Sequence, residues 1–184
     1  MTRADSAAMH RYLALFRGIN VGGQNLLPMA ELTALLGEVG CKDISTYIQS
    51  GNVVFSTANK CNPTKVSEIV GKIEASHGFA PTVVILSVAE LEGVIQANPY
   101  DTDDGQALHF FFLESKPEDA DLDHLRDLKS GAERFELHDK VLYLHAPSGI
   151  GRSKLAANVE KCVGVKVTAR NWNTVQKLRK LVGT

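Results

Sequence analysis

The sequence predicts an α+β protein built as a tandem duplication of ferredoxin-like βαββαβ units, packed into one compact body with a linking helix and a C-terminal helix. The first observation is that apolar residues change period along the chain in the order strand, helix, hairpin, helix, strand. The second is that this order recurs in the second half of the chain. The third is that several strands are apolar on both faces, so that each sheet needs a cover on both sides. We therefore expect the two halves to pack against each other.

The first unit is expected to span residues 10–87. It opens with an apolar run, Arg11 to Phe16, that ends at a glycine and is typical of a buried strand. The helix that follows is predicted from apolar positions at helical spacing, namely Leu32, Leu35, Leu36 and Val39. Two strand-like runs are joined around Ser50-Gly51, where glycine permits a tight turn. The Asn62-Pro63 pair, a cap followed by proline at the first helical position, opens the second helix, and "TVVILS" forms the last strand.

The second unit is expected to span residues 106–184, after a linking helix and loop at 88–105. A capping box, Ser87 to Glu90, opens the linking helix, and "ALHFFFL" is the first strand of the unit. A similar box, Ser115 to Glu118, is predicted to open the next helix. The hairpin "RFELHDKVLYLH", an amphipathic helix, the strand "VKVTA" and a final helix complete the unit. Residues 1–9 are expected to be an extra or disordered N-terminal segment.

Bulk composition argues against several classes of protein. A formal net charge of -1 disfavours a protein that simply coats nucleic acid. No apolar run has the length of a membrane span, and the amino terminus lacks the apolar core of a signal peptide, so we expect a cytoplasmic location. The three cysteines are widely spaced and are interpreted as unpaired thiols. Metal-ligand spacing and nucleophile–histidine pairing are both absent from the sequence, so we expect no metal and no cofactor, and no catalytic residue is predicted.

Polar residues and glycines gather in two stretches of the first unit. "FRGINVGGQN" follows the first strand, and "IQSGN" forms the turn of the hairpin. Because a crossover helix makes the first strand parallel to the first hairpin strand, both stretches should emerge at one edge of the sheet. Successive glycine amides can form an anion-binding nest, and arginine offers a planar fork for phosphate or carboxylate. The predicted ligand-binding residues are Arg17, Asn20, Gly22, Gly23, Asn25, Gln49, Ser50 and Asn52.

A second interpretation of these stretches needs no ligand. The glycines then only permit a tight backbone path, and the arginine and the side-chain amides satisfy loop carbonyls. "GINVGG" matches neither a Walker loop nor the GxGxxG pattern of dinucleotide-binding proteins. Sequence spacing alone favours neither interpretation.

Two further stretches precede helix starts in the second unit. In "GIGRSKL", Ser153 and Lys154 stand at a helix amino terminus, where N–H groups and the helix dipole attract anions. In "TARNWNTV", Arg170 and Asn171 come just before the final helix, and Asn171 or Asn173 is expected to cap it. Trp172 is interpreted as a packing anchor. Ser153, Lys154, Arg170 and Asn171 complete the predicted ligand-binding set. Whether these residues reach the first stretches depends on how the units pack, which the sequence leaves open.

Four stretches together resemble a known bacterial family. They are "RYLALFRGINVGGQNLLPMAEL", "TYIQSGNVVFST", "GIGRSKL" and "TARNWNTVQKL", and they follow the family's order from about His10 to Leu181. The family is catalogued as a domain of unknown function, number sixteen ninety-seven. The resemblance implies a duplicated ferredoxin-like α+β fold and no established activity, so it transfers no catalytic residue.

The leading hypothesis is that loops rich in glycine, arginine and asparagine bind a small phosphate-bearing ligand; whether the protein is an enzyme stays open. One alternative is a nucleic-acid-binding protein that uses a basic C-terminal face made of Lys154, Lys161, Lys177, Arg179 and Lys180. Another is a non-catalytic scaffold whose glycine loops serve the fold alone. The sequence predicts neither the identity of the ligand nor the oligomeric state.

Overall fold

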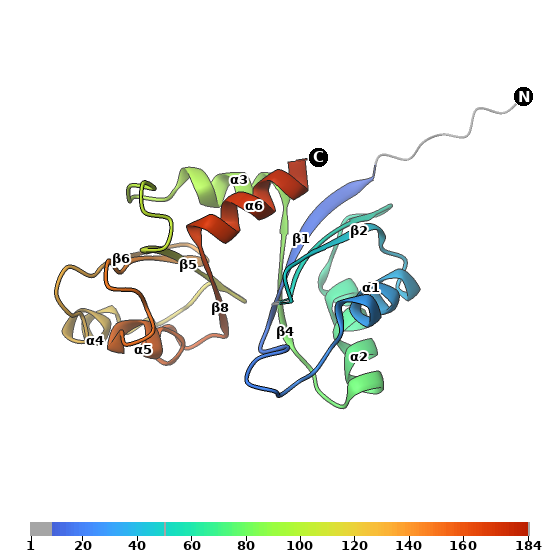
Figure 1. Cartoon of the computed structure of the whole chain (residues 1–184), viewed down its shortest axis with the longest axis horizontal. Coiled ribbons are helices and arrows are strands. Elements are labelled where there is room, and N and C mark those ends of the chain that lie inside the picture. The colour runs from blue at the N-terminus through green and yellow to red at the C-terminus, as the bar shows by residue number, and fades with distance from the viewer. Residues whose placement is uncertain (1–8, 50, 184) are drawn as a thin grey trace, which may run out of the picture. The chain divides into compact units, whose positions relative to one another are not determined.

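The computed structural model describes residues 9–49 and 51–183 of the chain. The chain divides into two compact units: unit 1 comprises Met1–Ala89 and Leu181–Thr184, and unit 2 comprises Glu90–Lys180. Figure 1 shows the helices and strands of both units.

Two expectations from the sequence fall on residues outside this description. They are the N-terminal segment 1–9, of which only Met9 is described, and Ser50 of the predicted ligand-binding set. The linking helix and loop, which the sequence sets apart as residues 88–105, fall almost entirely within unit 2.

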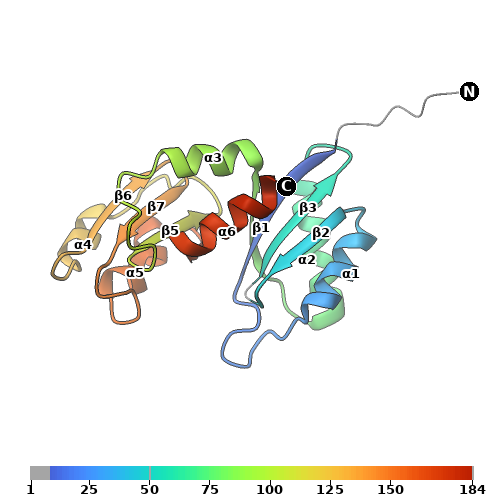
Figure 2. The same ribbon diagram turned by 45° about the horizontal axis from the view of Figure 1, so that its top comes forward.

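Unit 1 contains one four-stranded antiparallel sheet in the order β2-β3-β1-β4, with two helices on one face (Figures 1 and 2). Its elements in chain order are β1 (His10–Arg17), α1 (Met29–Glu38), β2 (Lys42–Tyr47), β3 (Asn52–Thr57), α2 (Pro63–His77) and β4 (Thr82–Ser87). This order confirms the βαββαβ arrangement predicted from the sequence. Because β1 lies between β3 and β4, the loop that leaves its end starts from the centre of the sheet.

The core of unit 1 forms where the two helices pack on the sheet. Leu32 and Leu36 of α1 and Ile69 and Ile73 of α2 are buried in one cluster with Phe55 of β3. On each helix the buried residues are four positions apart, so each helix turns one apolar side to the sheet.

The second helix begins as the sequence predicts. The side chain of Asn62 accepts a hydrogen bond of 2.9 Å from the amide of Lys65, and Pro63 occupies the first helical position. Gly78 ends the helix in the left-handed conformation, with a φ of 76°. Both ends of α2 therefore follow from local residue chemistry.

Strand β2 lies at an edge of the sheet and is irregular. Its register against β3 shifts between Lys42 and Ser45, and Asp43 between them has a φ of 49°. An irregularity of this kind bends a strand and interrupts its ladder of hydrogen bonds.

The turn between β2 and β3 approaches β1 closely at Gly51. The carbonyl of Gly51 accepts a hydrogen bond of 2.8 Å from the amide of Phe16, and Gly51 has a φ of 72°. A Cβ added to Gly51 would lie 2.6 Å from the Cβ of Phe16 and 3.0 Å from its carbonyl oxygen. Both the backbone dihedral and the available space therefore require glycine at this position.

Unit 2 repeats the arrangement, with a four-stranded antiparallel sheet in the order β6-β7-β5-β8. Its elements in chain order are most of α3 (Val88–Gln96), β5 (Leu108–Leu113), α4 (Leu122–Asp127), β6 (Arg134–His138), β7 (Val141–His145), α5 (Lys154–Val163), β8 (Val167–Asn171) and most of α6 (Trp172–Gly183). Helices α3 and α6 correspond to the predicted linking and C-terminal helices.

The sheet of unit 2 has helices on both faces (Figure 1). On one face, Phe111 packs with residues of α4 and α5 such as Leu125 and Leu155. On the other face, the Trp172 ring at the start of α6 stacks on Phe110 with ring centroids 5.6 Å apart. Helix α3 joins this second layer, because its Val94 carbonyl accepts a hydrogen bond of 2.7 Å from the Tyr143 hydroxyl. The sequence attributed the cover of the second face to the other unit, whereas here the linking and C-terminal helices contribute it.

One predicted helix start is wrong. The sequence places it in the capping box Ser115 to Glu118, but α4 begins at Leu122 after Asp121, whose side chain accepts a hydrogen bond of 2.9 Å from the amide of His124. The amide of Asp121 also donates to the carbonyl of Cys162 in α5 at 2.8 Å. This tertiary contact ties the chain to α5 before the helix starts, and a local sequence pattern does not report it.

We expect Gly51→Ala to lower the free energy of unfolding by at least about 2 kcal/mol. A residue with a Cβ in the left-handed region costs about 1–2 kcal/mol, and Phe16 would also have to move. Chemical unfolding followed by circular dichroism measures the loss. Gly71→Ala is the control: an added Cβ at Gly71 in α2 meets nothing within 4 Å, so this change should raise stability by about 0.5–1 kcal/mol. Similar effects of the two changes would contradict the close approach at Gly51.

Candidate functional site

The structure brings the two polar stretches of unit 1 into contact, at the sheet edge where the sequence places them. The side-chain amide of Asn20 donates to the carbonyl of Gln49 at 3.1 Å. The hydrogen bond between Phe16 and Gly51 is a second contact between the same two stretches. We call the described residues of these two segments, 17–28, 48–49 and 51–52, the loop cluster. Ser50 belongs to the second segment but lies outside the described residues.

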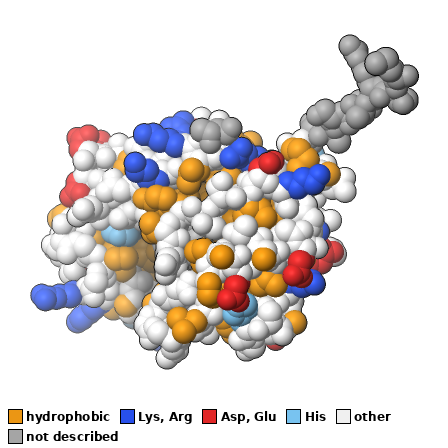
Figure 3. All heavy atoms as spheres, turned by 45° about the vertical axis from the view of Figure 1, so that its right-hand side comes forward, with side chains coloured by type: hydrophobic (Ala, Val, Ile, Leu, Met, Phe, Trp, Pro, Cys, Tyr) orange, Lys and Arg blue, Asp and Glu red, His pale blue; other side chains and the backbone are white. Residues whose placement is uncertain are grey.

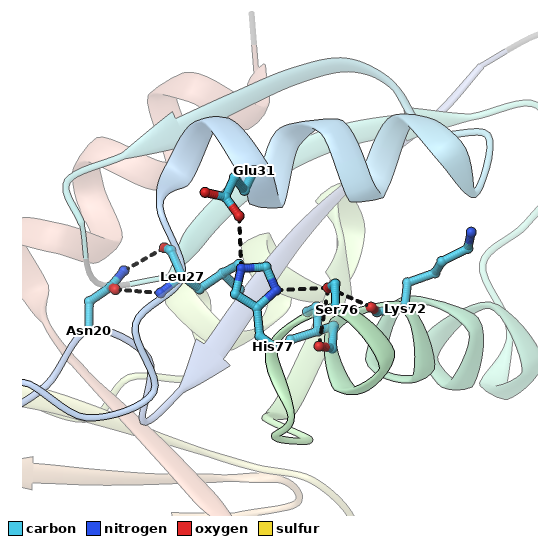
Figure 4. A network of polar contacts seen from close by, with 7 residues as sticks. Asn20, Leu27, Glu31, Lys72, Ser76 and His77 are labelled. Carbon is cyan, nitrogen blue, oxygen red and sulfur yellow. Dashed lines mark hydrogen bonds and ion pairs between the residues drawn. The ribbon is translucent and has the colours of Figure 1, made fainter.

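Asn20 holds the loop cluster together. Its side chain donates to the carbonyl of Leu27 at 2.8 Å and accepts from the amide of Leu27 at 2.8 Å, as Figure 4 shows. Its third side-chain hydrogen bond is the one to Gln49, and its backbone amide donates to the carbonyl of Asn25 at 3.1 Å. Asn20 was predicted to bind a ligand, but its side-chain amide is occupied in closing the loop.

The other two asparagines of the predicted set also bond to the backbone of unit 1. The side chain of Asn25 donates to the carbonyl of Gly18 at 3.0 Å. Asn52 is fully buried, and its side chain donates to the carbonyl of Tyr47 at 3.2 Å. These contacts agree with the interpretation in which side-chain amides satisfy loop carbonyls.

Two helices beside the loop are joined by a hydrogen bond between side chains. The Nε2 atom of His77, at the end of α2, lies 2.9 Å from a carboxylate oxygen of Glu31 in α1. Its Nδ1 atom lies 2.7 Å from the hydroxyl of Ser76 (Figure 4). Since the loop cluster leads directly into α1, this pair fixes the helix end to which the loop is attached.

The tip of the first loop is a two-glycine turn. The amide of Gln24 donates to the carbonyl of Val21 at 3.1 Å, and Gly22 and Gly23 between them have φ values of 59° and 75°. Nothing lies within 4 Å of a Cβ added to either glycine, so the dihedrals rather than space require them. Both are exposed, and within the described part of the chain their amides make no hydrogen bond.

Arg17 is the last residue of β1 and is half-buried at the base of this loop. The side chain of Gln49 is exposed on the neighbouring turn.

Residues 9–30 and 44–67 contain no aspartate or glutamate, although the whole chain has 21 acidic and 20 basic residues. The segments that form the loop cluster are therefore neutral apart from basic groups.

The predicted site at the start of α5 already contains a carboxylate of the protein. Ser153 caps the helix, because its hydroxyl accepts a hydrogen bond of 3.0 Å from the amide of Ala156. Glu133 is only 6% exposed, and its carboxylate accepts hydrogen bonds from the amide and the hydroxyl of Ser130 at 2.9 and 3.2 Å. It also accepts a hydrogen bond from the Ser153 hydroxyl. Lys154, the other predicted residue, is exposed.

Sequence reasoning missed Glu133. Burial acts to raise the pKa of its carboxyl group, but the hydrogen bonds from Ser153 and Ser130 and the charge of Lys129 outweigh burial, so that the pKa lies below its ordinary value. The only sequence signal is the serine three residues before the glutamate, a spacing common in turns.

Arg170 and Asn171, the last two predicted residues, directly precede α6. The guanidinium of Arg170 donates to the Thr168 hydroxyl at 2.8 Å and to the Ala169 carbonyl at 2.7 Å, and burial lowers its pKa to about 10. The side chain of Asn171 accepts a hydrogen bond of 3.0 Å from the amide of Thr174, so that Asn171, and not Asn173, caps the helix.

The proposed basic C-terminal face is partly neutralised. Arg179 donates two hydrogen bonds of 2.6 Å, one to each carboxylate oxygen of Glu92. A bidentate pair of this kind offsets one of the five positive charges on which the nucleic-acid hypothesis depends.

Other sites of reactivity find little support among the described residues. No group of three or more histidine, cysteine, aspartate or glutamate side chains there could hold a metal ion. Burial raises the pKa of the Cys41 thiol to about 11 and also raises that of Cys61, which opposes thiolate formation. The helices found in residues 9–49 and 51–183 are each too short or too polar to cross a membrane.

Comparisons with known proteins support the fold. A family model described as "Protein of unknown function (DUF1697)" matches residues 9–143. The structure of the conserved bacterial protein SP0830 from Streptococcus pneumoniae matches with a TM-score of 0.71 and 24% identity over 95% of this chain and 99% of that one. A putative glycine cleavage system transcriptional repressor also matches, with a TM-score of 0.24 and 10% identity over 89% of this chain and 97% of that one, which supports no argument. No curated protein matches significantly.

We expect Asn20→Gly to lower the free energy of unfolding by about 2–3 kcal/mol, since it removes three hydrogen bonds worth about 0.5–1.5 kcal/mol each. Glycine tolerates the left-handed φ of 55° at this position, so backbone strain is not added. Asn25→Gly is the matched control, with a φ of 50° and one side-chain hydrogen bond, and should cost less than about 1 kcal/mol. Urea unfolding of the variants measures both values. Equal losses of unfolding free energy would contradict the role of Asn20 in holding the loop cluster together.

We expect Glu133→Gln to destabilise the protein most at neutral pH. Because the pKa of Glu133 is lowered in the folded state, the ionised carboxylate contributes stability above its unfolded pKa, and this stability is lost as pH falls through the folded pKa. The difference in unfolding free energy between the native protein and the variant should therefore shrink below about pH 4. Urea unfolding across this pH range measures the difference, with exposed Glu118→Gln as the control. A difference that grows on acidification would contradict the assignment.

Proposed function

The chain belongs to the family described as "Protein of unknown function (DUF1697)", and we propose that it binds a small anionic, phosphate-bearing ligand at the loop cluster of unit 1. The proposal concerns binding, and no residue is assigned a reaction.

One observation carries this proposal. The adjacent amides of Gly22 and Gly23 lie at the exposed tip of a loop whose two asparagine side chains, Asn20 and Asn25, are used by the fold. Adjacent amides in a turn can point toward one side and bind an oxyanion. Arg17 at the base of the same loop adds a positive charge and a planar set of donors, which suits a phosphate group.

The surroundings favour an anion over a cation. The two chain segments of the loop cluster lack acidic residues, so a bound anion meets no like charge from them. The first acidic residue after the loop is Glu31 in α1, whose carboxylate is hydrogen-bonded to His77. The contacts of Asn20 hold both segments of the cluster in the free protein, so binding need not order them first.

The nucleic-acid hypothesis receives less support. Arg179 is paired with Glu92, which reduces the positive charge of the C-terminal face. The net charge of -1 also disfavours general binding of polyanions.

We expect inorganic phosphate or simple phosphate esters to bind and to raise the unfolding temperature. At about 100 times its dissociation constant, a ligand should stabilise the protein by about 2.7 kcal/mol, a shift of several degrees. Arg17→Ala should abolish this shift, whereas Arg17→Lys, which keeps the charge and loses the planar fork, should retain part of it. Thermal unfolding and isothermal titration calorimetry measure the effect.

The control is Arg126→Ala, which removes an exposed arginine that is paired with Asp123 in unit 2. It should bind phosphate as the native protein does. If Arg17→Ala folds normally and retains full phosphate binding, or if no phosphate compound binds to the native protein, the proposed function is wrong.

A further inference from the structure

The loop cluster also carries most of the exposed large hydrophobic residues of unit 1. Among the described residues of the chain, four large hydrophobic side chains are exposed, and three of them belong to the loop cluster. They are Val21 at 64% exposure, Leu26 at 64% and Ile48 at 55%; the fourth is Met9. We call the first three the apolar rim.

The contacts of Asn20 join the two backbone segments that carry the apolar rim. Asn20 bonds to the backbone of Leu27, the neighbour of Leu26, and to the backbone of Gln49, the neighbour of Ile48. Val21 directly follows Asn20 in the chain and begins the two-glycine turn. The apolar rim therefore belongs to the same two joined segments as the amides of the proposed anion site.

The fold does not explain why residue 48, in the turn after β2, is an isoleucine. It has a φ of 51°, in the left-handed region that β-branched residues adopt only under strain. Glycine or asparagine would adopt this conformation more easily. Its side chain is mainly exposed, so the strain is not compensated by burial in the core of unit 1. Strained residues that persist without a packing role often mark functional sites.

The apolar rim suits a small molecule better than a protein surface. Its three side chains are smaller than the aromatic residues that bury about 150–250 Å² each, so together they stay well below the roughly 1,200 Å² of a specific protein interface. On the face seen in Figure 3, hydrophobic side chains lie in small separate groups rather than in one large patch.

We infer that the ligand of the loop cluster is a phosphate monoester with an apolar group, whose phosphate meets Arg17 and the two glycine amides and whose apolar group packs on Val21, Leu26 and Ile48. This inference rests on the proposed function and names the class of its ligand. The absence of acidic residues from both segments and the charge of Arg17 favour a phosphate there, and the exposed aliphatic side chains provide the contact for a hydrocarbon chain or an aromatic ring. Phosphate esters without an apolar group cannot make this contact with the apolar rim.

The test compares four probes by isothermal titration calorimetry: inorganic phosphate, glycerol 3-phosphate, hexyl phosphate and phenyl phosphate. Burying an apolar group of about two methylenes corresponds to about a tenfold gain in affinity. We expect hexyl or phenyl phosphate to bind at least about tenfold more tightly than the two polar probes. Tighter binding of hexyl phosphate would identify an alkyl or acyl chain, and tighter binding of phenyl phosphate would identify a ring.

The decisive variant is Ile48→Asn. Asparagine removes the apolar side chain and tolerates the left-handed backbone, so the variant should be at least as stable as the native protein. It should lose most of the advantage of the apolar probes, bringing them to within about threefold of inorganic phosphate, and should leave the binding of inorganic phosphate unchanged. Met9→Gln, a change at an exposed large hydrophobic residue outside the rim, is the matched control and should alter nothing.

The outcomes separate this inference from the proposed function. If all four probes bind equally and Arg17→Ala abolishes their binding, the proposed function stands and the apolar contact is wrong. If no probe binds, the proposed function itself fails. If hexanol binds as tightly as hexyl phosphate and Arg17→Ala has no effect, the rim binds apolar groups without an anion and both proposals are overturned.

Discussion

The loop cluster of unit 1 depends on one side-chain amide. Between β1 and α1 the chain runs without a regular helix or strand, and its backbone groups need partners that a sheet or helix would otherwise supply. Asn20 provides partners for both polar groups of Leu27 and for the carbonyl of Gln49. The same contacts decide which parts of the loop face outward, namely the two-glycine turn and the three residues of the apolar rim.

This arrangement divides the unusual residues of the loop between fold and function. Asparagines and glycines drew attention in the sequence as ligand-binding groups, yet the side chains of Asn25 and Asn52 bond to backbone carbonyls of the fold. Gly22 and Gly23 satisfy the turn and still present their amides. A residue needed by the fold can therefore also serve a ligand when a second group of the same residue stays exposed.

The sequence predicted most of the fold and the position of the loop cluster, because both follow from local rules. Apolar period, the Asn62-Pro63 pair and the order of elements determine the βαββαβ topology, and this topology brings the ends of β1 and β2 to one edge. The sequence did not predict features that depend on partners far away in the chain or on the detailed path of a turn. The burial of Glu133 against Ser153, the delayed start of α4 and the left-handed φ of Ile48 all arise from contacts or turns that residue spacing does not encode.

The irregular edge strand β2 has a consequence for how this protein behaves at high concentration. A regular edge strand exposes a continuous row of amides and carbonyls to which a strand of another molecule can add. The register shift between Lys42 and Ser45 and the left-handed Asp43 break that row within a strand of six residues. The same part of β2 carries two exposed charged side chains, Lys42 and Asp43, which a joining strand would have to desolvate. This edge of the sheet is thus protected against intermolecular β-sheet growth, the first step of many aggregation pathways.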